Sequence, residues 1–205
     1  MKTAGVAFVT ATAAAAVLTP LVRAAARRWG LYDHALTSRK VHGRPIPRLG
    51  GVAIVLAFFV PLAALYFVDS EVGRRLWSEP RHALGLFVGG AMIAALGLVD
   101  DIRGTGARSK FLVQFGVAAL MYAFGYRIEV IANPFGGELA LGVFALPFTM
   151  LWIAGVVNAM NLVDGLDGLA GGVALIAVAS IFAVATLRAE PLMMLVTAAL
   201  AGAVL

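Results

Sequence analysis

Two adjacent aspartates, Asp100 and Asp101, stand at the end of a long apolar run in the stretch LVDDIRG. Each carboxylate is costly to desolvate there, and the two negative charges repel each other. The pair would also lie at the C-terminal end of a helix, where the macrodipole favours cations. A positive group should therefore offset it, and the candidates are Arg103, Lys110 or a divalent cation. Magnesium prefers one or two carboxylates with phosphate oxygens and water, so the pair is a candidate metal site for phosphate chemistry.

A second polar stretch, NAMNLVDGLDGLAGG, covers residues 158–172 between two apolar runs. Four amide or carboxylate side chains recur in it every three residues: Asn158, Asn161, Asp164 and Asp167. On a continuous α-helix each step of three drifts by about 60°, so the four side chains would fan across half of the helix. Gly165 and Gly168 indicate that the helix breaks or tightens here, which lets the backbone approach a ligand. A polar turn with one capping residue would explain only one of the four.

A third stretch, SRKVHGRPIPRLGG, covers residues 38–51 and is basic. It brings four cations within ten residues: Arg39, Lys40, Arg44 and Arg48. Its prolines and paired glycines keep the backbone out of a helix, and such a loop suits phosphate. The alternative is a basic loop that rests on anionic lipid headgroups, but that role needs no fixed conformation. His42, by its type alone, is an ordinary polar loop residue.

The elements that must position these stretches are membrane spans. Of the 205 residues 61% are hydrophobic and 13% charged, and the mean hydropathy of +0.94 lies far from that of an ordinary soluble domain. Apolar runs of about twenty residues predict spans at 4–22, 49–68, 83–99, 111–126, 139–157 and 169–187, and a seventh run begins at Pro191. We therefore predict an all-α polytopic membrane protein, with six complete transmembrane helices plus a seventh at the C-terminus, in a single integral membrane domain over residues 1–205. With no cysteine, the chain offers no thiol or disulfide chemistry.

The positive charges predict how the spans are oriented. The loops after the first, third and fifth runs hold ten of the sixteen Lys and Arg residues, and seven of those ten lie in the first loop. Since Lys and Arg are enriched in short cytoplasmic loops, the N-terminus is predicted to lie outside. The first run also resembles a signal peptide, but it is long, and the basic residues around the candidate cleavage site favour a retained anchor: Arg23, Arg27 and Arg28. All three polar stretches follow odd-numbered spans, so they share the cytoplasmic face and predict one composite site.

HGRPIPRLGG, LGLVDD and NAMNLVDGLDGLAGG, in this order and between spans in these positions, resemble the polyprenyl-phosphate N-acetylhexosamine-1-phosphate transferases. That superfamily includes the translocase that makes the first lipid intermediate of peptidoglycan. The resemblance covers the whole chain, and the third motif is the most specific. PRLGG, residues 47–51, differs from the Pro-Thr-Met-Gly-Gly associated with that translocase. This difference and the DGLDGLAGG wording favour the branch that uses UDP-N-acetylglucosamine.

The resemblance implies transfer of a sugar-1-phosphate from a UDP-sugar to polyprenyl phosphate, with release of UMP, as the first step of a lipid-linked cell-envelope glycan. The second pKa of a phosphate monoester is about 6, so the lipid phosphate is mostly dianionic at pH 7 and repels the diphosphate. Mg²⁺, with Mn²⁺ as an alternative, would offset this repulsion when held by Asp100 and Asp101. The implied catalytic residues are Asp100, Asp164 and Asp167. The implied substrate-binding residues are Arg39, Lys40, His42, Arg44, Arg48, Lys110, Asn158 and Asn161.

The resemblance also predicts the surroundings of the protein. We expect a multi-pass protein of the bacterial inner membrane with a cytoplasmic active site. Its partners would be a UDP-sugar, polyprenyl phosphate and the bilayer, without nucleic acid, and a homodimer is left open. Members of the superfamily have more spans, a further aspartate motif and a His-rich loop beyond the seventh span. We therefore expect the chain to be the N-terminal portion of a larger transferase fold, and these 205 residues not to catalyse transfer alone.

Two functions of other classes are the alternatives. Transporters also place polar residues beside broken helices, and a half-length chain could dimerise to form one. Against transport, the ionisable residues lie at the ends of the spans, and Gln114 is the only clearly polar side chain in a span near a motif. The other alternative is a catalytically inactive structural fragment. Magnesium-dependent exchange of UMP with a UDP-sugar would indicate a transferase, whereas uptake of uncleaved substrate would indicate a transporter.

Overall fold

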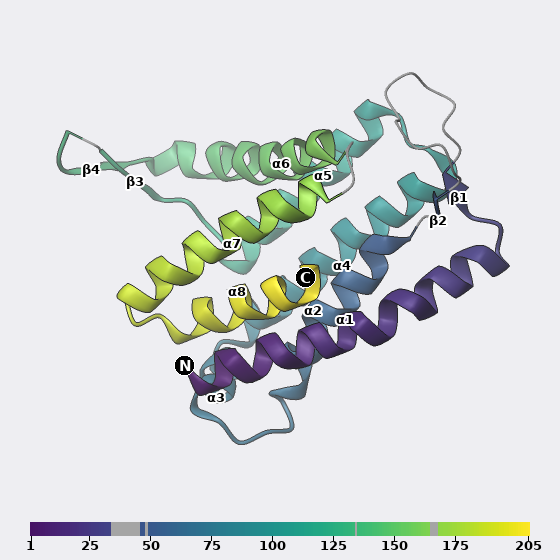
Figure 1. Ribbon diagram of the computed structural model, residues 1–205. Helices are drawn as coiled ribbons and strands as arrows, with labels where there is room; N and C mark the ends of the chain where they lie inside the picture. Colours follow the sequence, from purple (N-terminus) through teal and green to yellow (C-terminus); the bar gives the residue numbers. More distant parts are fainter. Residues whose placement is uncertain (34–45, 48, 134, 165–167) are drawn as a thin grey trace. The chain divides into compact units, whose positions relative to one another are not determined.

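The computed structural model describes residues 1–33, 46–47, 49–133, 135–164 and 168–205, and most of them are helical (Figure 1). The helices are α1 (Lys2–Arg28), α2 (Gly50–Ala64), α3 (Glu71–Ser78), α4 (Pro80–Arg103), α5 (Ala107–Phe124), α6 (Ala145–Val163), α7 (Leu169–Leu187) and α8 (Pro191–Val204). A short 3₁₀ helix, η1 (Gly142–Phe144), precedes α6. Two antiparallel strand pairs complete the fold: β1 (Tyr32–Asp33) with β2 (Ile46–Pro47), and β3 (Val130–Ala132) with β4 (Glu138–Ala140).

Each of the seven predicted apolar runs overlaps a helix, and α7 has the predicted bounds. In the described part of the chain, four helical segments are long and apolar enough to cross a membrane: α1, α4, η1 with α6, and α7. The helices α2 and α8 are apolar but shorter. The chain is thus a predominantly helical membrane protein. The predicted break in the second polar stretch, residues 158–172, is confirmed, because α6 ends at Val163 and α7 begins at Leu169.

The chain divides into two compact units, and unit 1 comprises residues 1–78 and 163–205. In unit 1, α8 packs against α1, α2 and α7, and Figure 1 shows it beside α1 and α7. Most of the buried residues of α1 and α8 are small: Ala4, Ala7, Ala11 and Ala26 on α1, and Ala198, Ala199, Gly202 and Ala203 on α8. A Cβ atom on Gly202 would lie 2.3 Å from the carbonyl oxygen of Phe8. Small residues therefore let the two helix backbones approach closely, as is typical of packing inside membranes.

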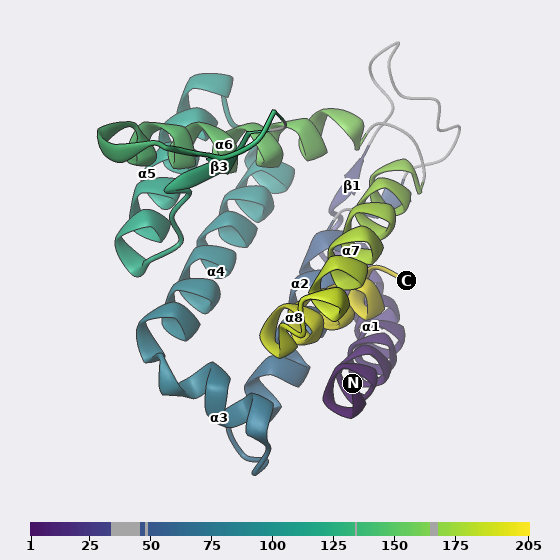
Figure 2. The same cartoon turned by 90° about the vertical axis from the view of Figure 1, so that its left-hand side faces the viewer.

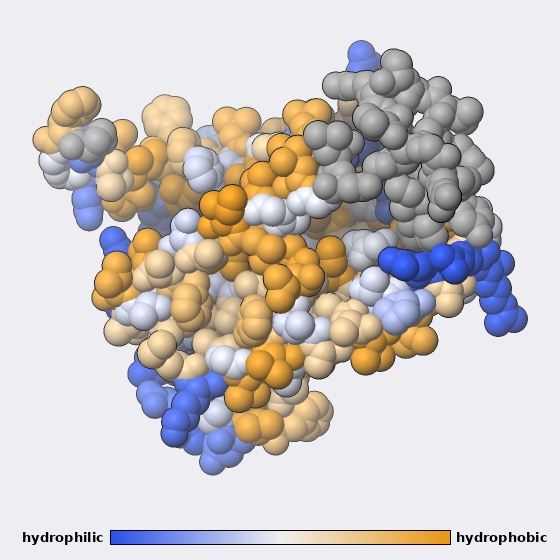
Figure 3. Space-filling view, viewed as in Figure 1, coloured by the Kyte–Doolittle hydropathy of each residue, from blue (hydrophilic) through white to orange (hydrophobic). Residues whose placement is uncertain are grey.

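Large apolar side chains cover the outside of unit 1. On α1, four of them are between 60% and 64% exposed: Val6, Val9, Val17 and Leu21. The space-filling view shows apolar surface along α1, α7 and α8, and hydrophilic surface at the end of α1 (Figure 3). The last turn of α1 holds Arg27 and Arg28. Such a surface is suited to hydrocarbon along the helices and to water or headgroups at their ends.

Unit 2 comprises residues 79–162 and begins with the hairpin of α4 and α5. Gly85 and Gly89 lie one turn apart on α4, where a Cβ atom would collide with Phe124 and Met121 of α5. Beyond α5, the backbone N–H of Ile128 donates to the hydroxyl of Thr149, which in turn donates to the carbonyl oxygen of Ala145. These bonds attach the start of α6 to the end of α5, and Figure 2 shows the helices and the β3–β4 hairpin of this unit from the side.

The helix α3 and the β3–β4 hairpin are among the elements that were not predicted from the sequence. The helix α3 carries Arg74 and Arg75 in exposed ion pairs and buries Gly73 and Leu76, so it is amphipathic and too charged for an apolar run. The hairpin β3–β4 occupies the start of the expected span 139–157, so that span was placed too early, and α6 begins at Ala145. The β-branched residues of IEVI and the Gly136–Gly137 pair are hairpin signals, which a search for apolar runs overlooks.

Candidate functional site

Asp100 lies in the last turn of α4, and both of its carboxylate oxygens are engaged. The backbone N–H and the hydroxyl of Thr105 donate to Oδ1 at 2.8 and 2.6 Å. The ammonium of Lys110 forms an ion pair with Oδ2, and each side chain of this pair is 23% exposed. Gly104 follows the helix with a φ of +66°, which turns the chain so that Thr105 reaches the carboxylate. Lys110 therefore offsets the charge of Asp100, and it is one of the three cations that the sequence suggested for this role.

The ion pair is well placed to meet an anion. Lys110 has three N–H donors on one ammonium, and the carboxylate of Asp100 fixes where that ammonium lies. The neighbouring Asp101 is exposed at the same end of α4. Because Asp100 already offsets the charge of Lys110, Lys110 would give a phosphate a hydrogen-bond donor, and a cation at the two carboxylates would have to supply the net positive charge.

α5 also contacts the second polar stretch, residues 158–172. Gln114, one turn after Lys110, is buried, and its Oε1 accepts a hydrogen bond from Nδ2 of Asn158 on α6. Asn161 is exposed three residues further along α6. In unit 2, successive turns of α5 thus contact Asp100 on α4, through Lys110, and Asn158 on α6, through Gln114. The sequence predicted that these stretches share a site, and α5 is the element that joins them.

The structure describes only some of the remaining predicted site residues. Asp164 is exposed and directly follows α6, in the other compact unit. Gly168, with a φ of +76°, is the N-cap of α7. Six predicted site residues lie outside the described residues, and their roles stay predictions: Arg39, Lys40, His42, Arg44, Arg48 and Asp167.

The end of the basic stretch has an unusual backbone. Leu49, buried and directly before α2, has a φ of +81°, which a residue with a side chain rarely adopts. Its carbonyl oxygen accepts from the N–H of Val52 at 3.0 Å. The two glycines that follow, Gly50 and Gly51, begin the helix. Strained positions of this kind cluster at ligand-binding segments, so Leu49 and the start of α2 are candidates for such a segment.

The donor set near Asp100 fits a magnesium ion only when other ligands complete the site. Among the described residues no group of three or more His, Asp or Glu side chains could hold a metal. Asp100 and Asp101 supply adjacent carboxylates, and magnesium commonly takes one or two, with phosphate oxygens and water as its other ligands. The residues therefore fit an ion that arrives with a phosphorylated substrate.

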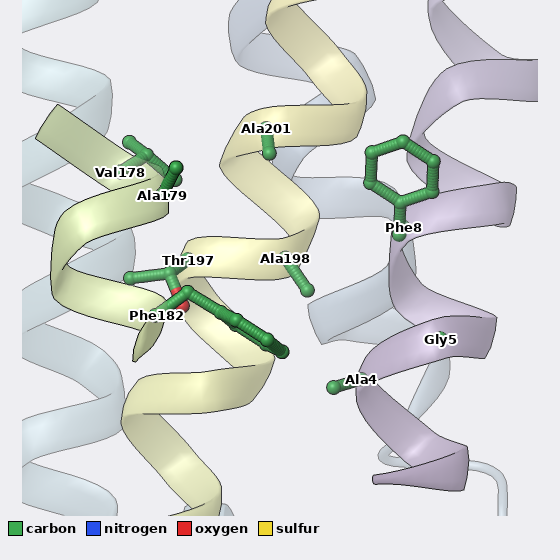
Figure 4. Close-up of a pocket in the computed structure, with 9 residues that line it drawn as sticks. All are labelled: Ala4, Gly5, Phe8, Val178, Ala179, Phe182, Thr197, Ala198 and Ala201. Atoms are coloured by element: carbon green, nitrogen blue, oxygen red, sulfur yellow. The ribbon is translucent and has the colours of Figure 1, made fainter. Parts of the chain in front are cut away.

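An apolar hollow of about 350 Å³ lies elsewhere, between α1, α7 and α8 of unit 1 (Figure 4). The rings of Phe8 and Phe182 line it together with small side chains. The hydroxyl of Thr197 also lines it, but donates to the carbonyl oxygen of Met193 in its own helix. The hollow contains no residue of the three polar stretches, so it is separate from the polar site.

Comparison with known proteins agrees with this arrangement. The family model described as "Glycosyl transferase family 4" matches residues 83–205, which is well over half of the chain. The chain belongs to glycosyl transferase family 4. The matched region of this family 4 member contains the Asp100–Lys110 pair, Gln114 and the asparagine motif. The family-level resemblance predicted from the three motifs is thereby confirmed.

Individual relatives of the family 4 member are similar over most of its length. A probable undecaprenyl-phosphate N-acetylglucosaminyl 1-phosphate transferase of Bacillus subtilis is 36% identical over 86% of this chain and 46% of the relative. A decaprenyl-phosphate N-acetylglucosaminephosphotransferase of Mycolicibacterium smegmatis is 34% identical over 82% and 42%. A phospho-N-acetylmuramoyl-pentapeptide-transferase of Listeria innocua is 33% identical over 64% and 42%. The chain thus spans less than half the length of these relatives.

Two residues of the site were not predicted. Thr105 binds Asp100, and Gln114 binds Asn158, yet neither was named as a site residue. The signal for Gln114 was available, because residues four apart on a helix share a face and Lys110 had been selected. Thr105 gave no such signal, because its contact depends on the left-handed turn at Gly104.

Proposed function

We propose that this family 4 member transfers N-acetylglucosamine-1-phosphate, or a related N-acetylhexosamine-1-phosphate, from a UDP-sugar to polyprenyl phosphate. An oxygen of the lipid phosphate attacks the β-phosphorus of the UDP-sugar. The bond from that phosphorus to the oxygen bridging it to the α-phosphorus breaks, and UMP leaves. The observation that carries the proposal is the Lys110–Asp100 pair beside Asp101, in a chain similar to transferases named for this chemistry.

The residues of unit 2 have distinct roles in this proposal. Lys110 donates hydrogen bonds to the phosphates of the two anionic substrates. Asp100 holds the Lys110 ammonium, and Thr105 holds the carboxylate of Asp100. Mg²⁺ bound by Asp100 and Asp101 would supply the net positive charge at the diphosphate. Asn161, exposed at the end of α6, would contact the nucleotide sugar.

The proposal extends to residues and features that only the sequence supports. Asp164 and Asp167 would complete the catalytic set, and the basic stretch from Arg39 to Arg48, with His42, would bind the diphosphate. The basic loops support an orientation with the N-terminus outside, six complete spans plus a seventh, and the site on the cytoplasmic face of a bacterial inner membrane. A homodimer stays a prediction.

A doubly labelled donor tests the reaction. The assay uses a hybrid protein, in which this chain is followed by the part of the Bacillus subtilis relative beyond the matched region. Membranes with the hybrid receive UDP-N-acetylglucosamine that carries ³H in the sugar and ³²P at the β-phosphorus. Both labels should enter the lipid fraction in equal amounts, and EDTA should prevent this until Mg²⁺ is restored.

Other distributions of the labels would contradict the proposal. Transfer of ³H without ³²P would indicate a glycosyl transfer that leaves the phosphate behind. Uncleaved donor inside sealed vesicles would indicate transport. The intact relative serves as the positive control, and membranes with only its C-terminal part as the negative control. An inserted hybrid that labels no lipid, while the relative does, would refute transfer by this chain's residues.

A further inference from the structure

Gln114 is a polar side chain enclosed by apolar helices. It is 4% exposed, and its neighbours on the same helix, Val117 and Ala118, are at most 1% exposed. A buried amide in apolar surroundings is costly unless it forms hydrogen bonds. Its Oε1 accepts from Nδ2 of Asn158, a residue 44 positions away in the sequence. The bond therefore links two different helices, α5 and α6, at a defined point.

The side-chain amide of Asn158 uses its hydrogen-bond donors inside the protein. One hydrogen of its Nδ2 is donated to Gln114 and the other to the carbonyl oxygen of Ala154, at 2.8 Å. Both N–H donors of this side chain are thus used inside the protein. Asn158, which the sequence suggested as a substrate-binding residue, has the geometry of a helix-to-helix contact.

α5 positions two motifs from one face. Lys110 and Gln114 are four residues apart, so they lie on the same face, one turn after the other. Lys110 binds Asp100 of α4, and Gln114 binds Asn158 of α6. Asn161 follows Asn158 by three residues, about 4.5 Å along the helix axis. The place of Asn161 relative to the Asp100–Lys110 pair therefore depends on the Gln114 contact.

A second contact fixes the other end of α6. Thr149, nine residues before Asn158, is buried and accepts from the N–H of Ile128, just beyond α5. With both contacts, α6 is held against rotation and sliding. Without the Gln114 bond only the far end would be held by a polar contact between these described segments, and the motif end could shift.

We propose that Gln114 is a positioning residue, which fixes α6 through Asn158 and so places Asn161 beside the Asp100–Lys110 pair. The structural part of this proposal stands on the contacts alone, and its consequence for catalysis rests on the proposed function. Gln114 does not touch the reacting groups in this scheme. It acts through Asn158, so the pair can be exchanged for another pair that makes the same bond.

Distances between spin labels test the proposal without any assay of transfer. The chain has no cysteine, so Ala123→Cys on α5 and Leu162→Cys on α6, both at exposed positions, carry the only two labels. In nanodiscs the labelled protein with Gln114 and Asn158 unchanged should give one narrow distribution of distances between the two labels. Gln114→Leu should broaden or shift it, and the exchange Gln114→Asn with Asn158→Gln should make it narrow again. Leu112→Val, at a position on α5 that is 74% exposed, is the control and should leave it unchanged.

The outcomes separate the two proposals. An unchanged distribution in Gln114→Leu, or an exchanged pair as broad as Gln114→Leu, would overturn the positioning role whether or not the protein transfers sugar phosphate. In the hybrid, Gln114→Leu should lower kcat by about tenfold or more with little change in KM, since misplaced groups slow the chemical step. A raised KM for the UDP-sugar with unchanged kcat would instead indicate a direct binding role.

Discussion

The two carboxylate oxygens of Asp100 have different partners. Oδ1 accepts two bonds from Thr105, and Oδ2 binds Lys110. The sequence allowed Lys110 to be predicted, because acids at a helix C-terminus need a nearby cation. It did not reveal Thr105, because that contact depends on the backbone conformation at Gly104. Charge compensation can thus be inferred from residue types, whereas short-range turn geometry requires coordinates.

Thr105→Val should remove the hydroxyl hydrogen bond to Asp100 and keep the bond from the backbone N–H. Loss of one hydroxyl bond to a charged group costs about 1.5 kcal/mol, so transfer by the hybrid should fall by about tenfold. Thr105→Ser keeps the hydroxyl and should retain most of the activity. Rates from the lipid-labelling assay provide the measurement. Equal rates in the Val and Ser variants would show that the hydroxyl is dispensable.

At the scale of elements, apolar runs predicted where helices occur, and the glycines of the second polar stretch, Gly165 and Gly168, predicted where one breaks. The seven runs each overlap a helix, and the break between α6 and α7 falls within the second polar stretch, residues 158–172. The helix α3 and the β3–β4 hairpin were missed because their signals are amphipathic and β-branched. The contacts between helices could not be predicted either. The chain has many small residues, and only the structure shows that Gly202 and Gly85 lie where two helices meet closely.

Gly202→Ala tests the close contact of α8 with α1. A Cβ atom there would lie 2.3 Å from the Phe8 carbonyl oxygen, so the backbones must separate. Overpacking of this kind typically costs about 1–3 kcal/mol, and thermal unfolding in detergent should begin at a lower temperature. Gly5→Ala is the matched control, because on α1 an added Cβ meets nothing within 4 Å. Equal stability of the two variants would contradict the close approach.

At the scale of the whole molecule, family membership and a helical membrane fold follow from motifs in a fixed order along the chain. The family 4 match covers residues 83–205, and the relatives are about twice as long as the part they share with this chain. The number of spans and the outward N-terminus stay predictions from charge and hydropathy. The composite nature of the site also remains a prediction, because the basic stretch lies outside the described residues and Asp164 belongs to the other unit.

The central claim is that Asp100 of this chain belongs to a phosphotransferase site. The direct measurement is exchange of radiolabelled UMP into UDP-N-acetylglucosamine, in membranes with the hybrid and polyprenyl phosphate. Asp100→Asn should abolish exchange while the protein remains inserted, because the variant no longer holds Lys110 or a metal as a carboxylate does. Asp69→Asn, which removes an exposed carboxylate paired with Arg74, should exchange at the normal rate. Normal exchange by Asp100→Asn would contradict the account.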